Sequence, residues 1–163
     1  MSIRRASSTG LGCIRLNDAR QRGTILCTQV RRATYQILVI EDSAADALII
    51  REAFAECGYR CELTVVASHA EAQAIIAGRC FDLLLCDYGG ERTGGSPVIR
   101  EMRERAPLTP IVVLSGYGDV RPAYRAGANA FVSKPGSLDE FFQKVRGIMQ
   151  FWIDVAQLPP TPQ

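Results

Sequence analysis

From Tyr35 onward, short unbroken runs of apolar residues alternate with longer stretches in which apolar residues recur every three or four positions. An unbroken apolar run is typical of a strand buried on both faces of a sheet, and the alternation is typical of βαβ units with parallel strands. The pattern therefore predicts an α/β domain with five strands at residues 37–40, 63–66, 81–86, 111–114 and 130–132.

Capping residues and glycines mark the predicted helices between these strands. Ser43 and Asp46 form a capping box that opens the first helix, and this capping is sufficient to explain Asp46. Gly58 ends that helix, and Ser137 with Glu140 opens the last one. The stretch before the fifth strand is short, so the fourth helix is expected to be truncated. The predicted helices cover residues 44–57, 69–77, 96–105, 122–127 and 138–155.

The last predicted helix is longer than the strand beneath it, so its final turns are expected to extend beyond the sheet. Trp152 falls on the core face of this helix, whereas Phe151 and Ile153 point elsewhere and are expected to be exposed. Exposed apolar groups of this size mark interaction sites, so Phe151, Trp152 and Ile153 predict a protein interface, most simply a homodimer. The alternative is that residues 158–160 fold back over them.

Charge divides the chain into two parts. Residues 1–34 contain seven arginines and one acidic residue, a net charge of +6, whereas residues 35–163 contain 12 basic and 16 acidic residues, a net charge of −4. The acidic domain argues against DNA binding. Residues 1–34 lack periodicity and are predicted to be a disordered basic leader or a misassigned start, with a functional basic arm and a targeting peptide as alternatives. The domain itself is expected at 35–158, followed by a Pro-rich tail at 159–163.

The length of the apolar runs and the pattern of cysteines indicate the cellular compartment of the protein. No run approaches the roughly 18 apolar residues that a membrane span requires, so no membrane association is expected. The six cysteines form no CxxC pair, and the single histidine leaves no zinc pattern, which favours reduced thiols in the cytoplasm. Cys57 and Cys61 are either a redox pair or two inert thiols, and their position across a helix end favours inert thiols.

Charged and hydroxyl side chains follow four of the five apolar runs. They are Glu41, Asp42, Asp87, Ser115 and Lys134. The carboxyl ends of parallel strands lie at one edge of a sheet, so these groups are expected to converge. Clustered carboxylates repel one another unless their pKa values rise or a cation binds, and oxygen ligands suit Mg²⁺. A carboxylate beside Mg²⁺ and a lysine is a candidate phosphoryl acceptor.

These residues and their spacing, together with Phe131 in the fifth run and Pro135 after Lys134, resemble the receiver domain of two-component response regulators. The resemblance covers residues 35 to about 156 and implies a doubly wound, flavodoxin-like sheet in the order 2-1-3-4-5. It also implies roles for individual residues: Asp87 as phosphoacceptor; Glu41, Asp42, Asp87 and the Gly89 backbone carbonyl as metal ligands; Ser115 and Lys134 as phosphate contacts; and Phe131 as the switch aromatic.

The resemblance implies a signalling switch that is not an enzyme. Such a protein accepts a phosphoryl group from a histidine kinase or phosphotransfer protein and then binds a partner. The ending 151–160 resembles that of single-domain regulators that partner phytochrome-type kinases. The alternatives are a receiver-like binding module that works without phosphate, a flavodoxin-like FMN protein, and an aspartate-based phosphatase.

Overall fold

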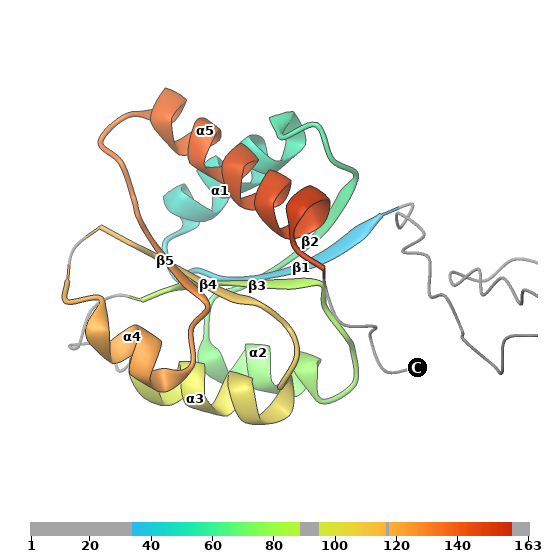
Figure 1. The fold of residues 1–163 in the computed structure, drawn as a ribbon, viewed down its shortest axis with the longest axis vertical. Coiled ribbons are helices and arrows are strands. Elements are labelled where there is room, and N and C mark those ends of the chain that lie inside the picture. The colour runs from blue at the N-terminus through green and yellow to red at the C-terminus, as the bar shows by residue number, and fades with distance from the viewer. Residues whose placement is uncertain (1–33, 89–94, 117, 158–163) are drawn as a thin grey trace, which may run out of the picture. The chain divides into compact units, whose positions relative to one another are not determined.

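Five parallel strands form one sheet in the order β2-β1-β3-β4-β5, which confirms the predicted doubly wound architecture (Figure 1). The structure is a computed structural model that describes residues 34–88, 95–116 and 118–157. The strands are β1 (Tyr35–Ile40), β2 (Cys61–Val66), β3 (Leu83–Asp87), β4 (Ile111–Ser115) and β5 (Ala130–Ser133).

The third strand begins two residues later than predicted and includes Asp87. Phe81 is buried in the core without being part of the strand. Asp82 is also buried, and its carboxylate accepts a hydrogen bond from the backbone amide of Gln36 at 2.9 Å. The apolar run predicted that β3 begins at Phe81. Instead, the Asp82 side chain bonds the start of β1, and β3 begins at Leu83.

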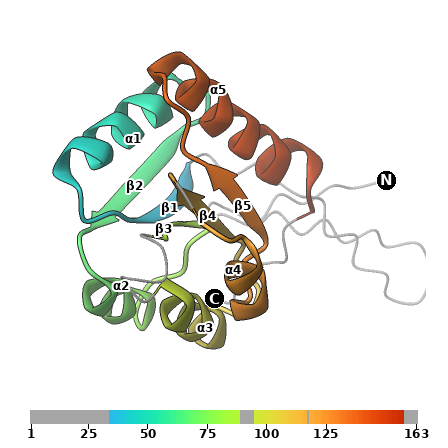
Figure 2. The same cartoon turned by 90° about the vertical axis from the view of Figure 1, so that its left-hand side faces the viewer.

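Helices cover both faces of the sheet (Figures 1 and 2). α1 and α5 pack on one face, and α2, α3 and α4 pack on the other, so the core forms two layers separated by the strands. The helices are α1 (Ala44–Glu56), α2 (His69–Ile76), α3 (Gly95–Arg105), α4 (Arg121–Ala126) and α5 (Leu138–Met149). Because both faces are covered, the central strands β3 and β4 are apolar up to their last residues.

The predicted helix boundaries have clear local causes. The Ser43 hydroxyl accepts a hydrogen bond from the backbone amide of Asp46 at 3.3 Å, and the Ser137 hydroxyl accepts one from Glu140 at 3.4 Å. α4 has only six residues, as expected, and ends at Gly127, whose φ of +107° is a left-handed conformation that suits glycine.

The C-terminal helix differs from the prediction of one continuous α-helix. α5 ends at Met149 and is followed by a π-helical segment, η2 (Gln150–Val155). The amide of Ala156 bonds the carbonyl of Phe151 at 2.7 Å, an i→i+5 hydrogen bond that widens the last turn. The wider turn changes the direction of the side chains that follow. Ile153, which we expected to be exposed, consequently packs against the core.

The predicted leader lies outside the described residues except for Thr34, and so does the Pro-rich tail. Among the helices of the described part of the chain, none is both long enough and apolar enough to cross a membrane.

Candidate functional site

The strand register places the reactive groups at one edge of the sheet. Near the carboxyl ends of neighbouring strands, Ile40 is paired with Cys86, Asp87 with Leu114, and Ser115 with Ser133. Glu41 and Asp42 follow β1 directly, and Lys134 follows β5. The convergence expected from strand ends in a parallel sheet is therefore present.

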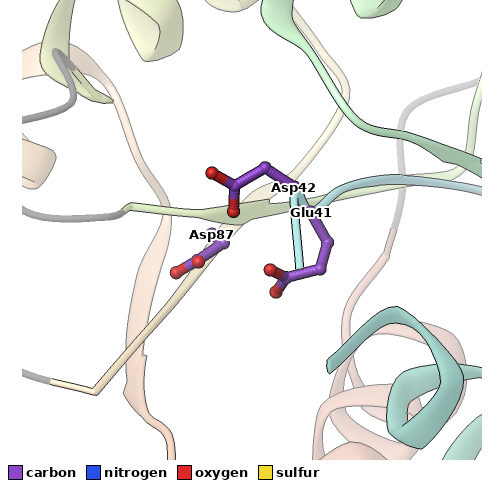
Figure 3. Close-up of side chains that lie close together, drawn as sticks. All are labelled: Glu41, Asp42 and Asp87. Carbon is purple, nitrogen blue, oxygen red and sulfur yellow. The ribbon is translucent and has the colours of Figure 1, made fainter. Parts of the chain in front are cut away.

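Three carboxylates form the centre of the site (Figure 3). Oxygen atoms of Glu41, Asp42 and Asp87 lie within 4.8 Å of one another. Glu41 is only 3% exposed, Asp42 is exposed, and the Asp87 side chain is 20% exposed. The cluster thus has a buried side at Glu41 and a side open to solvent at Asp42.

Burial raises the pKa of Glu41 above its usual value, and the charge of Asp87 raises it further. A hydrogen bond from Lys134 and one from the Ser43 backbone amide, at 3.1 Å, oppose this shift. Burial therefore dominates the environment of Glu41, and the two hydrogen-bond donors limit the rise of its pKa without reversing it.

Lys134 reaches three carboxylates from the end of β5. Its Nζ lies 2.7 Å from Glu41 Oε2, 2.6 Å from Asp46 Oδ2 and 3.4 Å from Asp87 Oδ2. Burial lowers the pKa of Lys134, but the hydrogen bonds to Asp46 and Glu41, with the charge of Asp87, outweigh burial and raise it overall. The lysine therefore stays charged and acts as a fixed cation beside Asp87.

Asp46 is the site residue that sequence reasoning missed. Its backbone amide caps α1 as predicted, but its side chain bonds Lys134. The sequence feature that could have identified Asp46 as a site residue is its position, one helical turn after the acidic pair Glu41 and Asp42. The predicted capping box assigned this carboxylate to the Ser43 backbone amide, and that half of the prediction is wrong, because the Ser43 amide donates to Glu41 Oε1 instead.

Ser115 and Phe131 lie on the strands next to the cluster. Ser115 is buried at the end of β4, and its carbonyl accepts a hydrogen bond from the Lys134 amide at 2.8 Å. Phe131 is half-buried, and its ring meets that of Tyr88 edge to face with centroids 6.3 Å apart. Gly89, which the sequence suggested as a metal ligand through its carbonyl, lies outside the described residues.

The donor set suits a hard divalent cation. Four carboxylates (Glu41, Asp42, Asp46 and Asp87) and one ammonium group (Lys134) give a net charge of −3 when all are ionised. Oxygen ligands of this kind bind Mg²⁺, which keeps several waters and needs few protein groups. The exposed Asp42 leaves the cluster accessible from solvent.

Comparison with known proteins agrees with this geometry. Residues 37–146 match the family model of the response regulator receiver domain. The match covers most of the domain, from β1 into α5, so the chain belongs to the response regulator receiver domain family.

Individual relatives support the same assignment. The response regulator Rcp1 of Synechocystis is 27% identical over 135 residues, which cover 76% of this chain and 92% of Rcp1. The crystal structure of the phosphorylated cyanobacterial phytochrome response regulator RcpA has a TM-score of 0.70 and 29% identity, covering 78% of this chain and all of that one. The Mn²⁺-bound form of Rcp1 has a TM-score of 0.67 and 25% identity, covering 77% and 99% of the two chains.

Proposed function

We propose that the protein is a single-domain response regulator that accepts a phosphoryl group on Asp87 and signals through a protein interaction that depends on this modification. The observation that carries the proposal is the position of Lys134, which bridges the acidic cluster and lies 3.4 Å from Asp87. Near-complete coverage of Rcp1 by the match supports the single-domain organisation.

Phosphoryl transfer follows from the groups around Asp87. A carboxylate oxygen of Asp87 attacks the phosphorus of a phosphohistidine, and the P–N bond breaks as the new O–P bond forms. The imidazole leaves with the electron pair and takes up a proton. Lys134 offers positive charge to the phosphoryl oxygens, and Ser115 at the end of β4 is the proposed hydroxyl contact.

Mg²⁺ is the proposed cofactor, held by Glu41, Asp42 and Asp87 with the Gly89 carbonyl as a further ligand. When bound, the metal neutralises charge on the transferring phosphoryl oxygens. The chain's own residues supply the rest: burial holds Glu41 in place, and Lys134 balances part of the negative charge. Phe131, packed against Tyr88, is the proposed switch aromatic.

The same residues argue against the alternative functions. An aspartate-based phosphatase needs a second acid two residues after its nucleophile, and position 89 is glycine. An FMN protein needs a phosphate-binding loop after β1, where Glu41 and Asp42 repel phosphate. The protein is therefore proposed to be a switch and not an enzyme acting on metabolites, and neither FMN binding nor phosphomonoester hydrolysis is expected.

The proposed donor is a histidine kinase or phosphotransfer protein in the cytoplasm. The RcpA structure is described as that of a phytochrome response regulator, which supports a photoreceptor-type kinase as the donor. DNA is not a proposed partner, because residues 35–163 carry a net charge of −4.

Metal-dependent labelling tests the proposal. Incubation with acetyl phosphate and Mg²⁺ should add one hydroxylamine-labile phosphoryl group, measured by intact mass. Chelation with EDTA, or Asp42→Ala with Mg²⁺ present, should slow labelling by about 100-fold. Glu56→Ala, which removes an exposed acid at the far end of α1, should not change the rate.

Two outcomes would contradict parts of this proposal. Equal labelling in EDTA would exclude a role for the metal. A wild-type protein that accepts no phosphoryl group from acetyl phosphate would favour the phosphate-independent binding module.

A homodimer is the proposed assembly, formed through the η2 segment. Phe151 is 50% exposed and Val155 is 65% exposed, one turn apart, while Trp152 and Ile153 pack partly against the core. The Phe151 and Trp152 rings meet edge to face with centroids 4.9 Å apart, which gives the exposed ring a defined orientation. A second copy of this chain would cover these apolar groups.

Analytical ultracentrifugation at micromolar concentration tests the dimer. The wild type should sediment as a dimer, and a Phe151→Glu, Val155→Glu double variant should sediment as a monomer. Leu108→Glu, a charge placed on another exposed apolar residue, is the control and should leave the dimer intact. A monomeric wild type, or a dimeric double variant, would show that this surface does not join two copies.

A further inference from the structure

Two carboxylates hold the ammonium group of Lys134 more closely than the proposed phosphoacceptor does. Its Nζ donates hydrogen bonds to Glu41 Oε2 at 2.7 Å and to Asp46 Oδ2 at 2.6 Å. Asp87 Oδ2 lies 3.4 Å away, near enough for an ion pair but farther than either of these two acceptors. The positive charge that the phosphoryl group requires is therefore already engaged on the side facing α1.

The two close contacts of Lys134 differ in how easily they can break. The Glu41 side chain is 1% exposed, so its carboxylate would lose a charged donor that water could not replace. The Asp46 side chain is 40% exposed, and water can solvate its carboxylate once the lysine leaves. A competing anion should therefore displace Asp46 from Lys134 before it displaces Glu41.

The side chain of Lys134 has room to move while its backbone stays in place. The Lys134 amide donates to the Ser115 carbonyl at 2.8 Å, which fixes the residue at the end of β5. Lys134 and Asp46 both line a cavity of about 210 Å³ between α1 and the start of α5. Because this space lies beside the ion pair and the lysine stem is flexible, the ammonium group can shift without displacing core side chains.

We propose that Asp46 is a positioning residue that competes with the phosphoryl group for Lys134. This inference rests on the proposed function, because it concerns the modification of Asp87. In the unmodified protein, Glu41 and Asp46 share the lysine. A phosphoryl group on Asp87 carries more negative charge than the carboxylate it replaces, so it draws the ammonium group away from Asp46 while the contact to Glu41 remains. Asp46 thereby favours the unmodified state.

Removing the charge of Asp46 should strengthen the binding of a phosphoryl mimic, whereas damage to the fold would weaken it. The probe is beryllium trifluoride with Mg²⁺, and fluorine NMR titration of the full chain measures its affinity. Asp46→Asn should bind it about fivefold more tightly than the wild type, the effect of losing one half-exposed ion pair. The substitution leaves the α1 cap intact, because the Ser43 hydroxyl accepts from the backbone amide of residue 46. Asp139→Asn, at an exposed first-turn aspartate of α5, is the control and should bind like the wild type.

A double-mutant cycle shows whether Asp46 acts through Lys134. If Asp46 repelled the anion directly, Asp46→Asn would have the same effect with or without the lysine. The cycle uses the rate of labelling by acetyl phosphate with Mg²⁺, which intact mass can follow even when Lys134→Met slows the reaction. Asp46→Asn should raise this rate about fivefold in the wild-type background, because the transition state also draws on Lys134. In the Lys134→Met background the rate should change by less than about twofold.

The outcomes separate this inference from the proposed function. Equal or weaker binding of beryllium trifluoride by Asp46→Asn overturns the inference, and so does an equal rise of the labelling rate in both backgrounds. Either result leaves the proposed function intact when the wild type binds the probe and is labelled. A wild type that does neither contradicts the proposed function and this inference together.

Discussion

Replacing Lys134 with methionine should lower the free energy of unfolding by about 2 kcal/mol at neutral pH without divalent cations. The variant leaves Glu41 buried without its charged partner, and losing one member of a buried ion pair is costly. The estimate lies below the range for fully buried pairs because the Lys134 side chain is 17% exposed. Urea denaturation with EDTA present measures the difference.

The same variant should show a specific dependence on pH. Burial already raises the pKa of Glu41, and without the hydrogen bond and charge of Lys134 it should rise further. An acid whose pKa is higher in the folded protein costs stability as the pH rises through that value. The deficit of Lys134→Met should therefore shrink as the pH falls from about 8 to about 5.

Lys144→Met is the matched control. Lys144 is half-buried on α5, and its Nζ donates to the Ser133 carbonyl without pairing to the acidic cluster. This variant should lose little stability, and its small deficit should not depend on pH. A Lys134→Met protein with wild-type stability at neutral pH would show that the Lys134–Glu41 pair contributes no net stability.

The sheet and its reactive edge were predictable because both depend on local sequence. Strands buried on both faces leave unbroken apolar runs, and the end of each run marks the carboxyl end of a strand. Glu41, Asp87 and Lys134 follow such ends, so the parallel arrangement alone brings them to one edge. The order of the strands is not contained in these runs, and it came from the resemblance to the receiver family.

Contacts between residues far apart in the sequence were harder to predict. Asp46 and Lys134 are 88 residues apart, and capping already explained Asp46 from its neighbours. The π-helical turn of η2 was also missed, because the heptad-like apolar spacing extends through Val155 without any glycine or proline to mark a change. Tertiary contacts accompany this turn: Ile153 packs on the core, and the Tyr59 hydroxyl donates to the Asp154 carboxylate.

Asp87→Asn should abolish labelling by acetyl phosphate and Mg²⁺. Asparagine has almost the same shape as aspartate, but its amide is not a nucleophile toward phosphorus, so no acyl phosphate can form. Asp87 contributes a charge that raises the pKa of Glu41, so removing it relieves repulsion within the cluster. The melting temperature of Asp87→Asn should therefore equal or exceed that of the wild type when EDTA is present.

This pairing of lost labelling with retained stability distinguishes a phosphoacceptor from a structural residue. Asp139→Asn, a substitution at an exposed aspartate in the first turn of α5, should label at the wild-type rate. Intact mass spectrometry and thermal melting of the three proteins provide both readouts. Labelling of Asp87→Asn to the wild-type extent would move the acceptor to a neighbouring carboxylate, of which Asp42 is the most exposed within the metal cluster.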